Sequence, residues 1–124
     1  MGQGYRKDRR FPRVPAEHSV LVRLLGGPRF EGFAKTRVIG LGGCMFVNRE
    51  SLGFGSLMEI LIAVKGRVIR ADARVAYEIP KGEREHQVGV EFLRLHPSDR
   101  ALLATLIAAA PGAVRRPGAA AAFA

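Results

Sequence analysis

The amino-acid sequence predicts a mainly β domain, a small antiparallel barrel or sandwich of about six strands followed by one α-helix. Three observations predict it. Between residues 19 and 95, apolar and polar side chains alternate with a period of two, as in strands with one buried face. Short turns that contain Gly or Pro separate these segments. After residue 95 the apolar spacing changes to three and four, the period of a helix.

The first two predicted strands are joined by a turn. Residues 19–25 (SVLVRLL) alternate, with Val20 and Val22 on the apolar side. Residues 26–28 (Gly-Gly-Pro) provide the turn. Residues 29–39 (RFEGFAKTRVI) alternate more loosely, and their charged side chains share one parity. This pattern indicates a strand with one solvated face.

The middle of the chain predicts two further strands. The glycine-rich residues 40–43 (GLGG) interrupt the pattern, and residues 44–48 (CMFVN) resume it as a short strand. A loop-like run at residues 48–56 precedes the apolar strand at residues 57–64 (LMEILIAV). Lys-Gly at residues 65–66 then makes a tight connection.

The clearest alternation lies in the fifth predicted strand, residues 67–79 (RVIRADARVAYEI), and residues 80–85 (PKGERE) indicate the next turn. The last predicted strand is residues 87–95 (QVGVEFLRL). The side chains expected to face inward are Ile69, Ala71, Ala73, Val75 and Tyr77 of the fifth strand and Val88, Val90 and Phe92 of the last.

An amphipathic helix is predicted at residues 96–110 (HPSDRALLATLIAAA), where Ser98 or Asp99 can cap the first turn. Pro-Gly at residues 111–112 ends it, and the biased remainder at residues 111–124 is predicted to be a disordered tail. The apolar positions of the helix are Leu102, Leu103, Leu106, Ile107 and Ala110.

Before the first predicted strand lies a basic segment, YRKDRRFPRVP, at residues 5–15. Five cations and one acid give residues 6–13 a local charge of +4, out of +9 for the chain. Arg9 and Arg13 are four residues apart, so in an extended backbone their side chains point the same way, roughly 13 Å apart. Guanidinium groups at that spacing, with Arg10 between them, can hold a small doubly charged ligand through phosphates or guanine edges. We therefore divide the chain into a flexible basic arm at residues 1–16, a barrel with its helix at residues 17–110, and the tail.

Catalytic and metal chemistry find little support in the sequence. His18, His86 and His96 are far apart and show no metal-ligand spacing with Cys44. No phosphate-binding loop of the Walker type is present, so the sequence does not predict an enzyme. No apolar run approaches the ~20 residues that cross a bilayer. A single cysteine fits a reducing cytoplasm, and the positive charge favours anionic partners.

The sequence resembles the PilZ domain family over roughly residues 5–110. The features that carry the resemblance are RRFPR (residues 9–13) ahead of a strand, a strand that ends in a GG turn, and the closing VGVEFLRLHPSDRALLATLI. The resemblance implies a six-stranded antiparallel β-barrel with a C-terminal α-helix, and binding of cyclic di-GMP. In the family, an RxxxR motif in the arm contacts the phosphates and guanine edges of the ligand. In this chain that motif corresponds to Arg9 and Arg13, with Arg10 as an added contact.

The family's second motif, [D/N]xSxxG, is only partly present. The resemblance places Val38 at the Asp or Asn position, Gly40 at the Ser position and Gly43 at the final Gly. Val38 and Gly40 have no side-chain polar group to offer a guanine, and two missing partners cost about 2–6 kcal/mol of binding free energy. Lys35 and Arg37 beside them can recover part of this through the phosphates. A tight turn at Gly43 is expected to require a positive φ.

Function is thus predicted as cyclic di-GMP binding by a cytoplasmic bacterial protein that relays the signal to a downstream protein partner. The alternative is a degenerate domain that does not bind the messenger and acts as a protein–protein adaptor. Nucleic-acid binding is disfavoured, because Phe11 lies in the arm but most other aromatic side chains, such as Phe46 and Tyr77, fall on apolar parities. Membrane attachment by the arm lacks an apolar anchor beside it.

Overall fold

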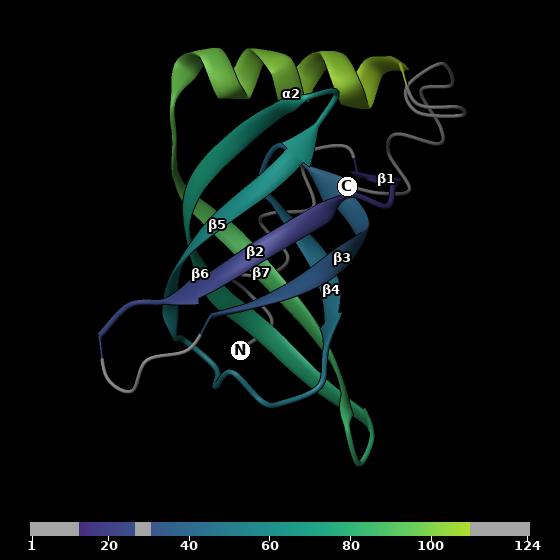
Figure 1. Cartoon of the computed structure of the whole chain (residues 1–124), viewed down its shortest axis with the longest axis vertical. Coiled ribbons are helices and arrows are strands. Elements are labelled where there is room, and N and C mark those ends of the chain that lie inside the picture. The colour runs from purple at the N-terminus through teal and green to yellow at the C-terminus, as the bar shows by residue number, and fades with distance from the viewer. Residues whose placement is uncertain (1–12, 27–30, 110–124) are drawn as a thin grey trace.

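The computed structural model describes residues 13–26 and 31–109, and Figure 1 shows the strands wound into a barrel with the helix across one end. No helix in this described part of the chain is long and apolar enough to cross a membrane. The elements are β1 (Arg13–Pro15), β2 (Ser19–Leu24), β3 (Glu31–Gly40), β4 (Gly43–Asn48), β5 (Leu57–Val64), β6 (Arg67–Gly82), β7 (Glu85–Leu95) and α2 (Pro97–Ala109).

Six of these strands form a closed antiparallel barrel. The order of hydrogen-bonded neighbours is β3-β2-β5-β6-β7-β4, and a further pairing of β4 with β3 closes the ring. The predicted mainly β fold, with six barrel strands and a C-terminal helix, is therefore confirmed, and the barrel is selected over the sandwich. The additional short strand β1 pairs only with β3, within the segment predicted as the basic arm.

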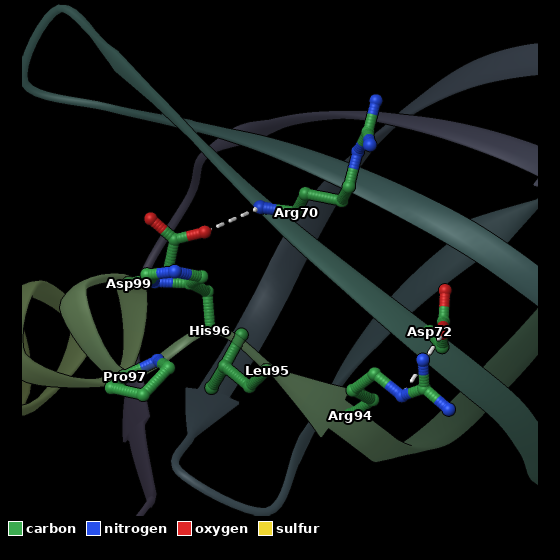
Figure 2. A pocket seen from close by; sticks show the side chains of 7 residues that line it. All are labelled: Arg70, Asp72, Arg94, Leu95, His96, Pro97 and Asp99. Carbon is green, nitrogen blue, oxygen red and sulfur yellow. Dashed lines mark hydrogen bonds and ion pairs between the residues drawn. The ribbon is translucent and has the colours of Figure 1, made fainter.

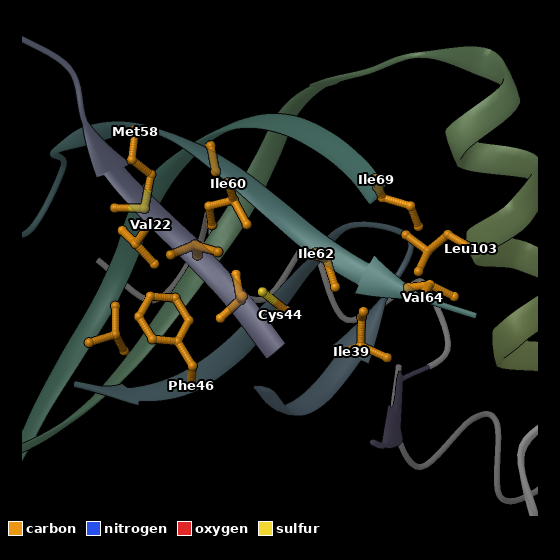
Figure 3. Close-up of a cluster of buried hydrophobic side chains, with 14 of the residues drawn as sticks. Val22, Ile39, Cys44, Phe46, Met58, Ile60, Ile62, Val64, Ile69 and Leu103 are labelled. Carbon is orange, nitrogen blue, oxygen red and sulfur yellow. The ribbon is translucent and has the colours of Figure 1, made fainter. Parts of the chain in front are cut away.

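The interior of the barrel is apolar because the inward positions of each strand carry branched side chains at a period of two. Val20 and Val22 of β2 lie opposite Ile62 and Ile60 of β5, and all four are at most 1% exposed. The helix closes one end, where Leu103 packs beside Val64 and Ile69 (Figure 3). The other buried apolar residues of this core are Val14, Ile39, Cys44, Phe46, Leu52, Met58, Ala73, Val75, Val88, Val90 and Ile107.

The predicted turn between the last two strands is shorter than residues 80–85. Strands β6 and β7 extend toward each other until only residues 83–84 separate them. Pro80 lies inside β6 beside an irregularity of the ladder between Pro80 and Gly82, and strands accommodate proline at such bulged positions. The Lys65–Gly66 turn is confirmed, and both residues adopt positive φ, as a two-residue hairpin loop of this kind requires.

Tyr77 and Phe92 are half-buried rather than fully inward. Each lies at a register shift of the β6–β7 ladder: Tyr77 at the shift after Val75, and Phe92, opposite Ala73, at the shift after Asp72. The Tyr77 ring lies against Gly89, where an added Cβ would come within 1.9 Å of the ring carbon Cε2. Gly89 is therefore required by the aromatic side chain on the neighbouring strand.

The helix begins with His96 as its cap, not with Ser98 or Asp99. The Ser98 amide donates to His96 Nδ1 at 3.2 Å, just ahead of Pro97 in the first helical position. Asp99 Oδ2 instead accepts a hydrogen bond from the Arg70 amide at 3.2 Å, which ties the first turn of α2 to β6. The expected cap was wrong because the Asp99 carboxylate faces a strand that is distant in sequence.

Candidate ligand site on strands β1 and β3

Strand β1 places Arg13 directly beside the second motif. Arg13 lies opposite Gly40, Val14 opposite Ile39 and Pro15 opposite Val38. Val14 and Ile39 are at most 1% exposed and face the core, so their neighbours along each strand face outward. The outer surface of the barrel therefore carries Arg13 and Val38, both half-buried, while Gly40, which lies opposite Arg13, is buried. Arg9 and Arg10, the other arginines expected at this site, lie outside the described residues.

A β-bulge adds a second cation to this surface. Thr36 lies opposite Phe46 of β4 and Val38 opposite Met45, so Arg37 is the extra residue on β3. The bulge leaves Arg37 and Val38 on the same outer face, where the Arg37 side chain is exposed. Lys35 is also exposed on this strand. The arrangement can hold an anion by charge, with Val38 as an apolar surface that offers no hydrogen bond.

Gly43 is needed for a different reason than the sequence predicted. Its φ is not positive; among the described glycines, positive φ occurs at Gly26, Gly53, Gly55 and Gly66. A Cβ at Gly43 would instead lie 2.0 Å from the carbonyl oxygen of Val90 on β7. The expected conformational role was wrong because β4 and β7 approach each other too closely here for any side chain.

Cys44 links this surface to the interior. The thiol is buried behind β3 and β4, opposite Ile39. Burial raises its pKa from 9.0 to about 12, and the positive charge of Arg13 acts in the opposite direction. The thiol is thus a neutral part of the core, where a buried cysteine packs as a small apolar side chain.

We expect Cys44 to be at least about 100-fold less reactive toward a thiol reagent at pH 8 in the folded domain than in denaturant. Because the folded pKa lies above the ordinary value, the buried thiol stabilises the fold below pH 9.0, and this contribution is lost as the pH rises toward about 12. Reagent kinetics and denaturation at pH 8 and pH 10 measure both effects, with Cys44→Ala as the reference. Rapid labelling of the folded protein would contradict the buried position.

The three histidines lie in three separate places. His18 precedes β2, His86 lies in β7 opposite Asn48, and His96 caps α2. Across residues 13–26 and 31–109, no group of three or more His, Cys, Asp or Glu side chains is placed to hold a metal ion.

A cavity of about 440 Å³ lies elsewhere, at the beginning of α2 (Figure 2). Its arginines are matched by acids: Arg70 Nε lies 3.1 Å from Glu59 Oε2, and Arg94 Nε lies 3.8 Å from Asp72 Oδ2. In Figure 1, β1 lies toward the opposite end of α2 from this cavity. No local sequence signal indicated it, because strands β6 and β7 and helix α2 meet there only in the folded chain. The lining residues are Arg70, Asp72, Arg94, Leu95, His96, Pro97 and Asp99.

The fold and the site define a small closed-barrel domain. Its outer face carries Arg13 of β1 beside the β3–β4 hairpin, which contains Gly43. The PilZ domain model matches residues 7–109. The chain belongs to the PilZ domain family. No curated protein sequence matches it.

Solved structures share the fold at low sequence identity. The Bacillus subtilis inhibitor of motility MotI has a TM-score of 0.65 and 19% identity, covering 77% of this chain and 47% of its own. The K. pneumonia MrkH complex with c-di-GMP has a TM-score of 0.62 and 19% identity, covering 80% and 50%. The PilZ domain of YcgR from Escherichia coli, with c-di-GMP, has a TM-score of 0.59 and 16% identity, covering 79% and 87%. This chain thus spans about half the length of MotI and MrkH.

Proposed function

We propose that this protein is a cytoplasmic receptor for cyclic di-GMP and not an enzyme. The observation that carries the proposal is the β1–β3 register, which pairs Arg13 with Gly40 and leaves the half-buried Arg13 on the outer face of the barrel. A cyclic dinucleotide carries two phosphates, and guanidinium forks match phosphates and the O6/N7 edge of guanine. Membership of a family with known c-di-GMP complexes supports the same ligand.

In this proposal, Arg9, Arg10 and Arg13 contact phosphates and guanine edges, and Arg37 adds charge from the bulge. Strand β1 already holds Arg13 against β3, and ligand binding fixes the part of the basic arm that precedes β1 near Val38, Gly40 and Gly43. The ordered arm changes the surface of the domain, and a downstream protein partner recognises that change.

A second function, a protein–protein adaptor that does not bind the messenger, is favoured by one specific observation. Val38 is half-buried and Gly40 is buried beside strand β1, and neither supplies a polar side chain there. The site keeps its charge while lacking the groups that distinguish guanine. Under this second function, the natural protein does not bind cyclic di-GMP.

Calorimetric titration with cyclic di-GMP at physiological salt separates the two functions. Val38→Asp combined with Gly40→Ser is expected to tighten binding by about 30-fold or more, since two polar partners are restored. A linear guanine dinucleotide serves as the ligand control. Measurable binding by the natural protein supports the receptor. Binding seen only after restoration supports the adaptor, and no binding by either folded protein contradicts the alignment of the motif.

A further inference from the structure

The connection between β1 and β2 contains one residue too many for a regular ladder. Both strands run antiparallel to β3: Pro15 lies opposite Val38, and Ser19 lies opposite Lys35. Residues 16–18 therefore face only residues 36–37. Unless a specific interaction accommodates the extra residue, the register of β1 on β3 is not determined by the register of β2 on β3.

The Thr36 side chain provides this interaction. Its hydroxyl donates to the Ala16 carbonyl oxygen at 2.7 Å and accepts from the His18 amide at 2.9 Å. Two backbone bonds flank these, from the Thr36 amide to the His18 oxygen at 2.9 Å and from the Ala16 amide to the Arg37 oxygen at 3.0 Å. The hydroxyl thus bridges both sides of the extra residue, Glu17.

Burial of the Thr36 side chain strengthens its two hydrogen bonds across the connection. Thr36 is 0% exposed, so water cannot replace either bond. A hydroxyl has a single proton, and here it is committed to Ala16. On the other side of the connection, His18 Nδ1 lies 3.1 Å from the Ala63 carbonyl oxygen of β5 and ties the same bend to a second strand.

We propose that Thr36 is a positioning residue that fixes β1 and thereby presents Arg13 to the ligand. The inference rests on the proposed function, because Arg13 matters only if the site binds an anion. Thr36 lies on the inner side of β3 and does not touch the outer surface where the ligand would lie. It acts through the bend at residues 16–18, three residues beyond Arg13.

Thr36→Val tests the proposal, because valine keeps the shape of threonine and removes both hydrogen bonds. We expect cyclic di-GMP affinity to fall about tenfold. We also expect the Val14 and Ala16 amides to exchange hydrogen about tenfold faster, measured by NMR without ligand. Thr36→Ser retains the hydroxyl and should restore both values to within about threefold of the natural protein.

Thr105→Val is the matched control, since it removes the hydroxyl of an exposed threonine whose bond to Ala101 lies within α2. It should change neither measurement. If Thr36→Val does not fold, Thr36→Ala, which adds no bulk, takes its place. Unchanged exchange at Val14 and Ala16, or unchanged affinity in a folded Thr36 variant, overturns the positioning role. If the natural protein binds no ligand, the proposed function fails, while the exchange experiment still decides whether Thr36 holds β1.

Discussion

Arg13→Ala is expected to weaken cyclic di-GMP binding at least about 100-fold while leaving the barrel folded. A bidentate contact from a guanidinium to a charged or polar group contributes about 3 kcal/mol or more, which is a factor of about 100 in affinity. The side chain is half-exposed on the outer face, and the core position next to it belongs to Val14. Loss of the guanidinium therefore removes a ligand contact without opening the interior.

Titration of Arg13→Lys and Arg94→Ala beside Arg13→Ala separates geometry from charge. Lysine keeps the charge and loses the fork, so an intermediate affinity is expected. Arg94 has a side chain that is 85% exposed on β7, away from β1, and its loss lowers the net charge equally. Equal weakening by Arg13→Ala and Arg94→Ala would mean that binding depends on overall charge alone, and the specific site would be abandoned.

The strands could be predicted where the local pattern of apolar residues matches the set of side chains that face the core. Residues 57–64 were predicted to the residue, because an apolar strand is followed at once by a Lys-Gly turn that only a hairpin accommodates. Strand β1 was not predicted. Its three residues lie in a sequence dominated by charge and proline, and only the pairing with β3 makes Val14 a core residue.

The features of the candidate site also fall into those that the sequence predicted and those that it did not. The resemblance led to Arg13, Val38, Gly40 and Gly43, and the β1–β3 and β3–β4 pairings bring these positions to one part of the barrel. The bulge that exposes Arg37 and the bonds made by Thr36 depend on partners outside β3, such as Met45, Ala16 and His18. Such features have no local pattern, so they emerge only from the folded chain.

The survival of the last glycine in an otherwise substituted motif has a structural explanation that does not involve the ligand. Strand β4 begins at Gly43, which lies opposite Glu91 of β7, and this pair helps to close the barrel. The Gly42 carbonyl oxygen accepts a hydrogen bond from the Phe92 amide at 2.8 Å, which holds the two strands close together. Gly43 would therefore be required whether or not the domain binds a nucleotide, and its presence does not distinguish receptor from adaptor.

Gly43→Ala is accordingly expected to destabilise the domain strongly. The new Cβ would lie 2.0 Å from the Val90 carbonyl oxygen, a backbone atom that moves only if β4 and β7 separate. Overpacking of this kind costs about 3 kcal/mol, which lowers the melting temperature of a domain of this size by at least about 12 °C. Gly82→Ala is the matched control, because its Cβ meets only Glu85 Cβ at 4.0 Å and should change the melting temperature by less than about 3 °C. Calorimetry compares the melting temperatures of the two variants. A Gly43→Ala protein with the melting temperature of the natural protein would show that β4 and β7 leave room for a side chain at Gly43.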